Sequence, residues 1–168
     1  MSEALDRLKI RGRPKLGPRD FALEDKLYVA FDADDTDPVG DDLIVESIRF
    51  PDFSSNWSRF SNPADVRLRP NGRSDDGCYS LTVRMARYKE LATTVHDPVS
   101  DEAYQNYAHV EIRELQPGES VYSEPPRNRK SSSRGRKNLR LEYRQNIINH
   151  HIIELEIGEE LPKTEKTE

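Results

Sequence analysis

Short runs in which apolar and polar residues alternate recur through the first two thirds of the chain. Residues 26–32, 79–85 and 108–115 carry apolar side chains at nearly every second position, and residues 43–50 and 91–95 are two further apolar runs with less regular spacing. Because successive side chains of a β-strand point to opposite faces, this period of two predicts strands. The spacing between the runs is typical of antiparallel sheets. The pattern therefore predicts a β-rich body.

The period changes near the C-terminus. Leu139, Tyr143 and Ile147 recur every four residues, which predicts a helix over residues 138–149, and residues 152–157 predict a final strand. No internal repeat accompanies these elements. We therefore expect an α+β fold, in which a β-rich antiparallel sheet is joined by one C-terminal helix and by disordered basic and acidic tails.

Charge divides the chain more sharply than hydropathy does. Residues 1–20 carry six Lys and Arg against three acids and residues 124–144 carry eight against two, whereas residues 21–123 hold twenty acids against ten bases. The net charge of −5 thus conceals two basic segments beside an acidic body. We expect a flexible basic arm over 1–20, a β-rich body over 21–123, a basic flexible linker over 124–137, a helix and strand packed on the body over 138–157, and an acidic tail over 158–168.

The composition supports tails and limits the setting. Only 34% of the 168 residues are hydrophobic and another 34% are charged, which is little apolar surface for a chain packed throughout. The single Cys78 excludes an intramolecular disulfide, and no apolar run reaches the length of a membrane helix. We expect a cytoplasmic protein with no membrane segment, no cofactor and no bound metal, and the oligomeric state stays open.

The first basic segment contains Arg11-Gly12-Arg13-Pro14-Lys15, which resembles an AT-hook. In that motif the glycine lets the backbone approach the floor of the DNA minor groove while the flanking arginines lie along it. The resemblance covers five residues and implies DNA contact. A related Arg-Gly-Arg-Lys stands in the second basic segment, without the proline.

These segments indicate the first functional hypothesis, a small nucleic-acid-associated or accessory binding protein. Cations on two segments would contact the phosphates of DNA or RNA, or an acidic protein surface. Solvated basic tails and a structural role in a protein complex are the alternatives. The candidate binding residues are Arg11, Gly12, Arg13, Lys15, Arg134, Arg136 and Lys137.

A second hypothesis comes from the strand predicted over 108–115. There His109, Glu111 and Arg113 fall on the face opposite the apolar one, and together with Arg59 they would suit an enzyme that acts on a phosphodiester or a nucleotide. A solvent-facing row of an antiparallel sheet gives the same pattern. The four residues are therefore candidate catalytic residues, and enzymatic activity is less expected than binding.

Two further segments complete the analysis. In LYVAFDADDTD a hydrophobic strand is followed by Asp32-x-Asp34-x-Thr36, which resembles the first motif of haloacid dehalogenase-like phosphotransferases. The rest of the chain lacks the alternating helices of a parallel sheet, so we expect a hydrated acidic loop between two strands. The pattern SSNWSRFSNPADV followed by AHVEI resembles one in small uncharacterised bacterial proteins, which implies a bacterial source. Within it, Asn62 before Pro63 predicts a capped helical turn.

Overall fold

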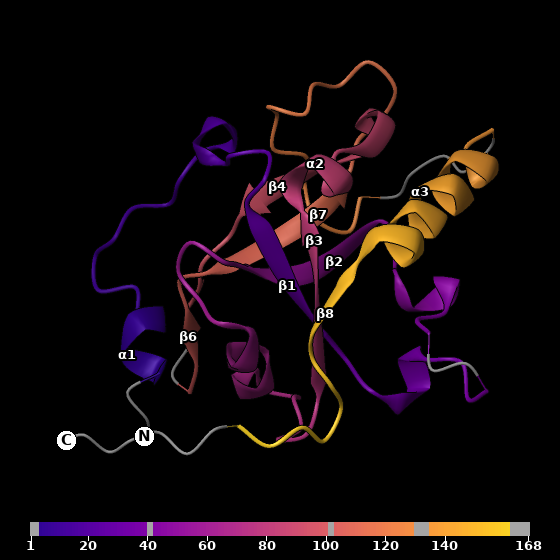
Figure 1. Cartoon of the computed structure of the whole chain (residues 1–168). Coiled ribbons are helices and arrows are strands. Elements are labelled where there is room, and N and C mark those ends of the chain that lie inside the picture. Colours follow the sequence, from indigo (N-terminus) through magenta and orange to yellow (C-terminus); the bar gives the residue numbers. More distant parts are fainter. Residues whose placement is uncertain (1–3, 40–41, 101–102, 130–134, 162–168) are drawn as a thin grey trace.

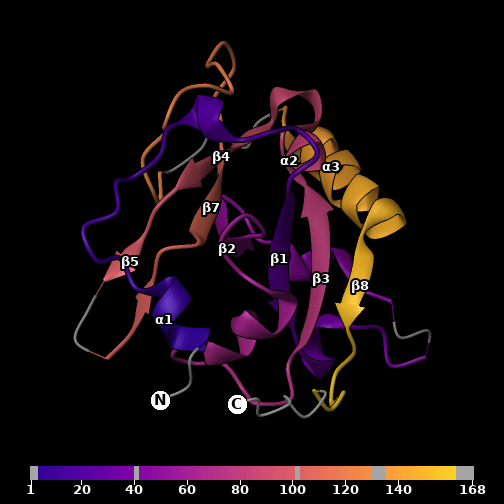
Figure 2. The same cartoon turned by 60° about the vertical axis from the view of Figure 1, so that its left-hand side comes forward.

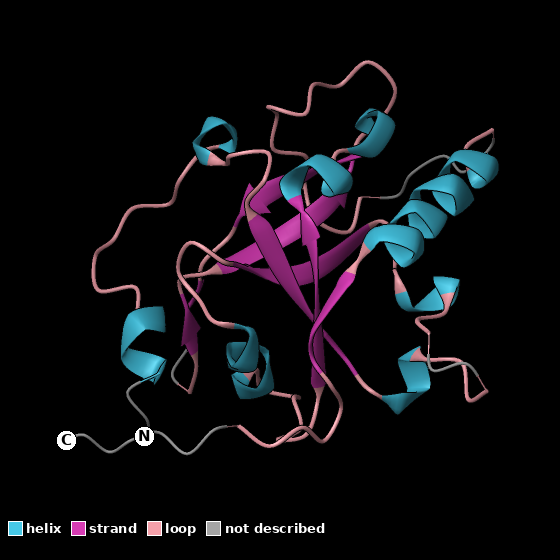
Figure 3. Ribbon diagram, viewed as in Figure 1, coloured by secondary structure: helices cyan, strands magenta, loops and turns pink. Residues whose placement is uncertain are grey.

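The computed structural model describes residues 4–39, 42–100, 103–129 and 135–161. It has an α+β fold, in which helices and helical turns surround one central sheet (Figures 1 and 3). The helices are α1 (Ala4–Leu8), α2 (Val83–Ala86) and α3 (Lys137–His150), and 3-10 turns cover Pro18–Asp20, Ala33–Asp35, Val45–Ser47, Pro63–Leu68 and Tyr88–Glu90. The strands are β1 (Lys26–Phe31), β2 (Asp52–Trp57), β3 (Gly77–Thr82), β4 (Ala92–His96), β5 (Val99–Ser100), β6 (Gln105–Asn106), β7 (His109–Glu114) and β8 (Ile152–Leu155).

The central sheet has the order β4-β7-β2-β1-β3-β8, and each neighbouring pair is antiparallel. The α+β class, the antiparallel sheet and the C-terminal helix are thus as the apolar pattern predicts. Strands β5 and β6 form a separate two-stranded hairpin. Since β7 and β2 lie inside the sheet, their side chains project from its two faces at its middle rather than at an edge.

One face of the sheet is the main core. Leu27, Trp57 and Val110 project from it, and each is fully buried. Helix α3 covers part of this face, because the side chains of Tyr143 and Ile147 insert among these residues. Figure 2 shows α2 and α3 together on the side of the sheet where β3 and β8 lie, with α1 on the opposite side of the molecule.

The strand predicted over residues 43–50 is wrong. Val45–Ser47 is a 3-10 turn, and the strand lies after Pro51, over Asp52–Trp57. The apolar residues of 43–50 are not evenly spaced, and buried Ile48 reaches the core from a turn. In the true strand one of the core-facing positions is Ser55, a polar residue that hides the period of two. The predicted turn after Asn62 is present as Pro63–Leu68, where Asp65 completes the cap.

The N-terminal basic segment lies along the body from residue 6 to residue 20, in contrast to the flexible arm expected for it. Leu8 is fully buried and its carbonyl accepts a hydrogen bond from Tyr107 N at 2.7 Å. Arg7 bonds the buried carboxylate of Asp65 at 2.6 Å, and the Tyr107 hydroxyl donates to Pro14 O at 2.6 Å. Apolar and backbone contacts therefore hold this basic segment on the body, and its charge alone did not predict them.

Candidate functional site

The second face of the sheet carries a cavity of about 660 Å³. Strands β1, β2 and β7 form its floor, the acidic turn after β1 and the chain after Pro63–Leu68 form two of its walls, and the β5–β6 hairpin closes another side. The residues that matter for its chemistry include Tyr28, Asp34, Asn56, Tyr104, Asn106 and His109. It has the size of a small-molecule site and is more polar than most.

The polar floor follows from strand periodicity. Asn56 pairs with Tyr28 of β1 on one side and with His109 of β7 on the other, so the three side chains stand in one row across the sheet. Asn56 Oδ1 accepts a hydrogen bond from Asn106 Nδ2 at 2.7 Å. Asn106 also bonds the Tyr104 hydroxyl, whose pKa is nevertheless raised, because burial disfavours the phenolate. The floor is a connected layer of fixed polar groups.

The acidic turn contributes most of the charge of the cavity. Asp32, Asp34 and Asp35 all line it, and burial raises the pKa of Asp35. Arg49 and Arg69 line the cavity as well, but Arg69 Nη1 bonds the buried carboxylate of Asp76 at 2.9 Å. The turn that we expected to be a hydrated loop thus forms one wall of the cavity.

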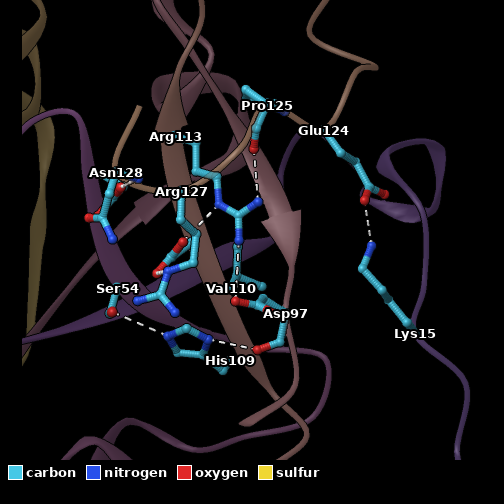
Figure 4. A network of polar contacts seen from close by, with 12 residues as sticks. Lys15, Ser54, Asp97, His109, Val110, Arg113, Glu124, Pro125, Arg127 and Asn128 are labelled. Atoms are coloured by element: carbon cyan, nitrogen blue, oxygen red, sulfur yellow. Dashed lines mark hydrogen bonds and ion pairs between the residues drawn. The ribbon is translucent and has the colours of Figure 1, made fainter. Parts of the chain in front are cut away.

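His109 lies at the edge of this cavity with both ring nitrogens engaged. Nδ1 is 2.8 Å from Asp97 O, and Nε2 is 3.2 Å from Ser54 Oγ (Figure 4). A carbonyl oxygen only accepts hydrogen bonds, so Nδ1 carries the proton and Nε2 of the neutral ring accepts one from the Ser54 hydroxyl. Ser54 is exposed and also lines the cavity. Ser54 was not among the predicted site residues, because it lies 55 residues from His109 in the chain and only the fold brings the two together.

Glu111 and Arg113 share the face of His109 but are committed to ion pairs. Glu111 is only 2% exposed, and its two oxygens bond Arg113 Nε at 2.7 Å and Arg127 Nε at 2.9 Å. Arg113 also bonds Asp97 Oδ2 at 3.2 Å and donates to Pro125 O at 2.8 Å. A carboxylate held between two guanidinium groups is a poor general base, so this pair organises the site rather than reacting in it.

Arg59 and His96 do not converge on His109. Arg59 is exposed and lies over Trp57, with its guanidinium carbon 5.6 Å from the ring centroid. His96 pairs with Val110 and so belongs to the core face of the sheet. Its Nδ1 accepts a hydrogen bond from Leu16 N at 2.9 Å, and burial lowers its pKa. The predicted catalytic group of four therefore keeps only His109 in a reactive position.

Most of the candidate nucleic-acid residues have partners inside the chain. Arg11 bonds Asp6 at 3.3 Å, Lys15 bonds Glu124 at 2.7 Å and Arg136 lies 3.4 Å from the buried carboxylate of Glu114. Arg13 stacks over the Tyr107 ring at 4.0 Å. Gly12 takes a left-handed φ of 75°, Lys137 is exposed at the start of α3, and Arg134 lies outside the described residues.

Two other features of the described chain bear on the site. None of its helices is long and apolar enough to cross a membrane, and among its residues no three His, Cys, Asp or Glu side chains gather where they would hold a metal ion. Comparisons with protein-family models, with curated protein sequences and with solved structures find no match to this chain.

Proposed function

We propose that the protein binds a small molecule rich in hydrogen-bond donors, such as a sugar or an amino sugar, in the cavity on the polar face of the sheet. The observation that carries the proposal is the cavity itself. Acceptor groups from the acidic turn, from β2 and from the β5–β6 hairpin face one space of about 660 Å³ above a rigid sheet. Polar groups that converge on a concave space are a usual mark of a ligand site.

The charge of the walls favours the class of ligand. Asp32, Asp34, Asp35 and Asp52 line the cavity, against Arg49 and the already paired Arg69. Carboxylates accept hydrogen bonds from hydroxyl and ammonium groups and repel phosphates. The aromatic rings of Tyr28 and Tyr104 add flat apolar surface, against which the carbon face of a sugar ring packs. A nucleotide, which the sequence suggested as a substrate, fits these charges less well.

Nucleic-acid binding receives less support from the same contacts. Arg11, Lys15 and Arg136 each bond an acid of the same chain, and Arg13 is engaged with Tyr107. Phosphate binding would require these cations to exchange one acidic partner for another, which reduces the electrostatic gain. We therefore prefer the cavity to the basic segments as the functional site.

Calorimetric titration with glucosamine, glucose and glucose 6-phosphate tests the proposal. We expect glucosamine to bind most tightly and the phosphorylated sugar most weakly. Asp34→Asn removes one exposed carboxylate of the wall and should weaken glucosamine about tenfold, which is the size of one charge-assisted hydrogen bond. Asp42→Asn, in the exposed chain beside the same turn but outside the cavity, is the matched control. Absence of saturable binding for all three sugars would contradict the proposal, as would tightest binding of the phosphate.

A further inference from the structure

The edge of the cavity at His109 contains the parts of a nucleophilic centre. We propose that Ser54 is a nucleophile activated by His109, and that the protein hydrolyses carboxylic esters of the hydroxyl- or amine-bearing alcohols that the cavity admits. The alcohol part of this inference rests on the proposed binding function. The reactivity of Ser54 rests on Asp97 O, His109 and Arg127, which are drawn with it in Figure 4.

The first of these groups fixes the base. Asp97 O accepts the Nδ1 proton of His109 at 2.8 Å, so the ring has one tautomer and one orientation. Nε2 then presents its lone pair to Ser54 Oγ at 3.2 Å. A hydroxyl, an imidazole and an oxygen that orients the imidazole form the arrangement that activates serine in hydrolases of unrelated folds. Here a backbone carbonyl stands in the position that a carboxylate often occupies.

The surroundings of Ser54 separate it from the structural serines of the chain. Ser55 Oγ is buried and donates to Val110 O at 3.0 Å, and Ser61 Oγ donates to Trp57 O at 2.9 Å. Both hydroxyls donate to backbone carbonyl groups, and neither is directed to a base. Ser54 is exposed to the cavity and directs its hydroxyl to an imidazole. A substrate can therefore reach the one serine of the three that has a base beside it.

Arg127 supplies positive charge where the reaction needs it. Its Nε bonds Glu111 Oε2 at 2.9 Å, and Glu111 is the direct cross-strand partner of Ser54. Figure 4 shows the Arg127 guanidinium on the same side of the sheet as Ser54 and turned toward the His109 ring. The Arg127 side chain is 58% exposed, so its terminal nitrogens are open to a bound group. Glu111, held from the other side by Arg113, is a positioning residue.

The step that follows is balanced in atoms and electrons. Ser54 Oγ bonds to the ester carbonyl carbon while its proton passes to His109 Nε2, and the negative charge on the former carbonyl oxygen lies beside Arg127. The bond from carbon to the alcohol oxygen then breaks, and the alcohol leaves with the proton from Nε2. Water attacks the acyl-serine by the same route in reverse, with His109 as its base, and releases the carboxylic acid.

A fluorophosphonate tests Ser54 without any knowledge of the natural ester. The serine oxygen displaces fluoride from phosphorus, and peptide mapping by mass spectrometry locates the adduct. We expect one adduct, on Ser54, in the full-length protein. Ser54→Ala should abolish it, and His109→Gln should slow its formation at least a hundredfold, because the general base is lost. Arg127→Gln should slow it more than tenfold, whereas Arg59→Gln, on the other side of the sheet, should have no effect.

Three further measurements keep the two proposals distinguishable. Hydrolysis of 4-nitrophenyl acetate should follow the same order of variants, and thermal unfolding shows that each variant is folded. Calorimetry of Ser54→Ala with glucosamine reports on the cavity alone. An adduct on Ser54 without sugar binding would support the nucleophile and remove the proposed ligand class. The assignment of Ser54 as a nucleophile would be overturned if the folded protein gave no adduct on Ser54. It would also be overturned if the His109→Gln variant formed the adduct as fast as the original protein, whatever the cavity binds.

Discussion

The two faces of the central sheet use the same strands for opposite purposes. On the core face, Trp57 and Val110 are fully buried under helix α3 and the chain that precedes β1. On the cavity face, their sequence neighbours Asn56 and His109 form an open polar row. Because side chains alternate along a strand, each of these polar residues is followed by a buried apolar residue on the opposite face. The positions of the cavity groups are fixed by packing on the far side of the sheet.

On each face, nevertheless, a buried glutamate of β7 forms ion pairs with arginines. Glu111 on the cavity face bonds Arg113 and Arg127, and Glu114 on the core side bonds Arg140 at 2.8 Å and lies 3.4 Å from Arg136. Arg127 and Arg136 come from the basic segment expected to be a linker. At these positions the basic segment supplies the arginines, and strand β7 supplies the glutamates, of ion pairs within the chain.

The largest expected effect is on the core face. Trp57→Ala should lower the free energy of unfolding by about 3 to 5 kcal/mol, because it empties a fully buried site and removes the ring stacked 3.9 Å from Phe21. Arg59→Ala, two residues along and exposed, should change the free energy of unfolding by about 0.5 kcal/mol or less. Urea denaturation measures both. Equal effects would mean that Trp57 does not contribute the core packing described.

The two glutamates sharpen the comparison. Glu114→Gln should lower the free energy of unfolding by about 3 kcal/mol, since it leaves two largely buried guanidinium groups beside a neutral amide. Glu111→Gln should cost less, because Arg113 keeps Asp97 and Pro125 O while Arg127 reaches water. Denaturation of both variants in the same buffer decides the order. A larger loss for Glu111→Gln would place the main electrostatic support on the cavity face instead.

Local patterns predicted the elements that are local in origin. Apolar patterning was sufficient for β1, β4 and β7, and the four-residue spacing was sufficient for α3, because each element buries a continuous apolar face whose period is written in its own residues. Strand β2 was missed because Ser55 occupies a core-facing position, where its hydroxyl bonds Val110 O. This hydrogen bond satisfies the buried hydroxyl, but its acceptor belongs to β7, so the residues next to Ser55 in the sequence do not reveal it.

The candidate site shows the same limit. His109 was identified from the sequence because its strand is strongly periodic. Its partner Ser54 was not, since the register between β2 and β7 depends on the whole sheet, and Asp97 acts through its backbone carbonyl, which no side-chain pattern marks. Charge counting located the arginines but not their acidic partners, because the ion pairs of Glu111 with Arg127 and of Glu114 with Arg136 join segments that only the tertiary fold brings together.

The smallest expected effect is a dependence of the free energy of unfolding on pH, caused by His96 on the core face. Burial is the main cause that lowers the pKa of His96 on the core face, with nearby Lys15 acting in the same direction and the bond to Tyr107 O and Asp97 opposing it. In the unfolded chain His96 titrates near its ordinary value of 6.5. Below that pH the unfolded chain binds more protons than the folded one, so the free energy of unfolding falls.

We therefore expect a plateau of stability above pH 6.5 and a decline between pH 6.5 and 5, with a slope of at most about 1.4 kcal/mol per pH unit from this one group. His96→Gln retains an acceptor and a donor but does not titrate, so its decline over this range should be shallower. Urea denaturation at several pH values measures both slopes. If His96→Gln declined as steeply as the original protein, the proton-linked loss would belong to another group, and the core face would not be the pH-sensitive one.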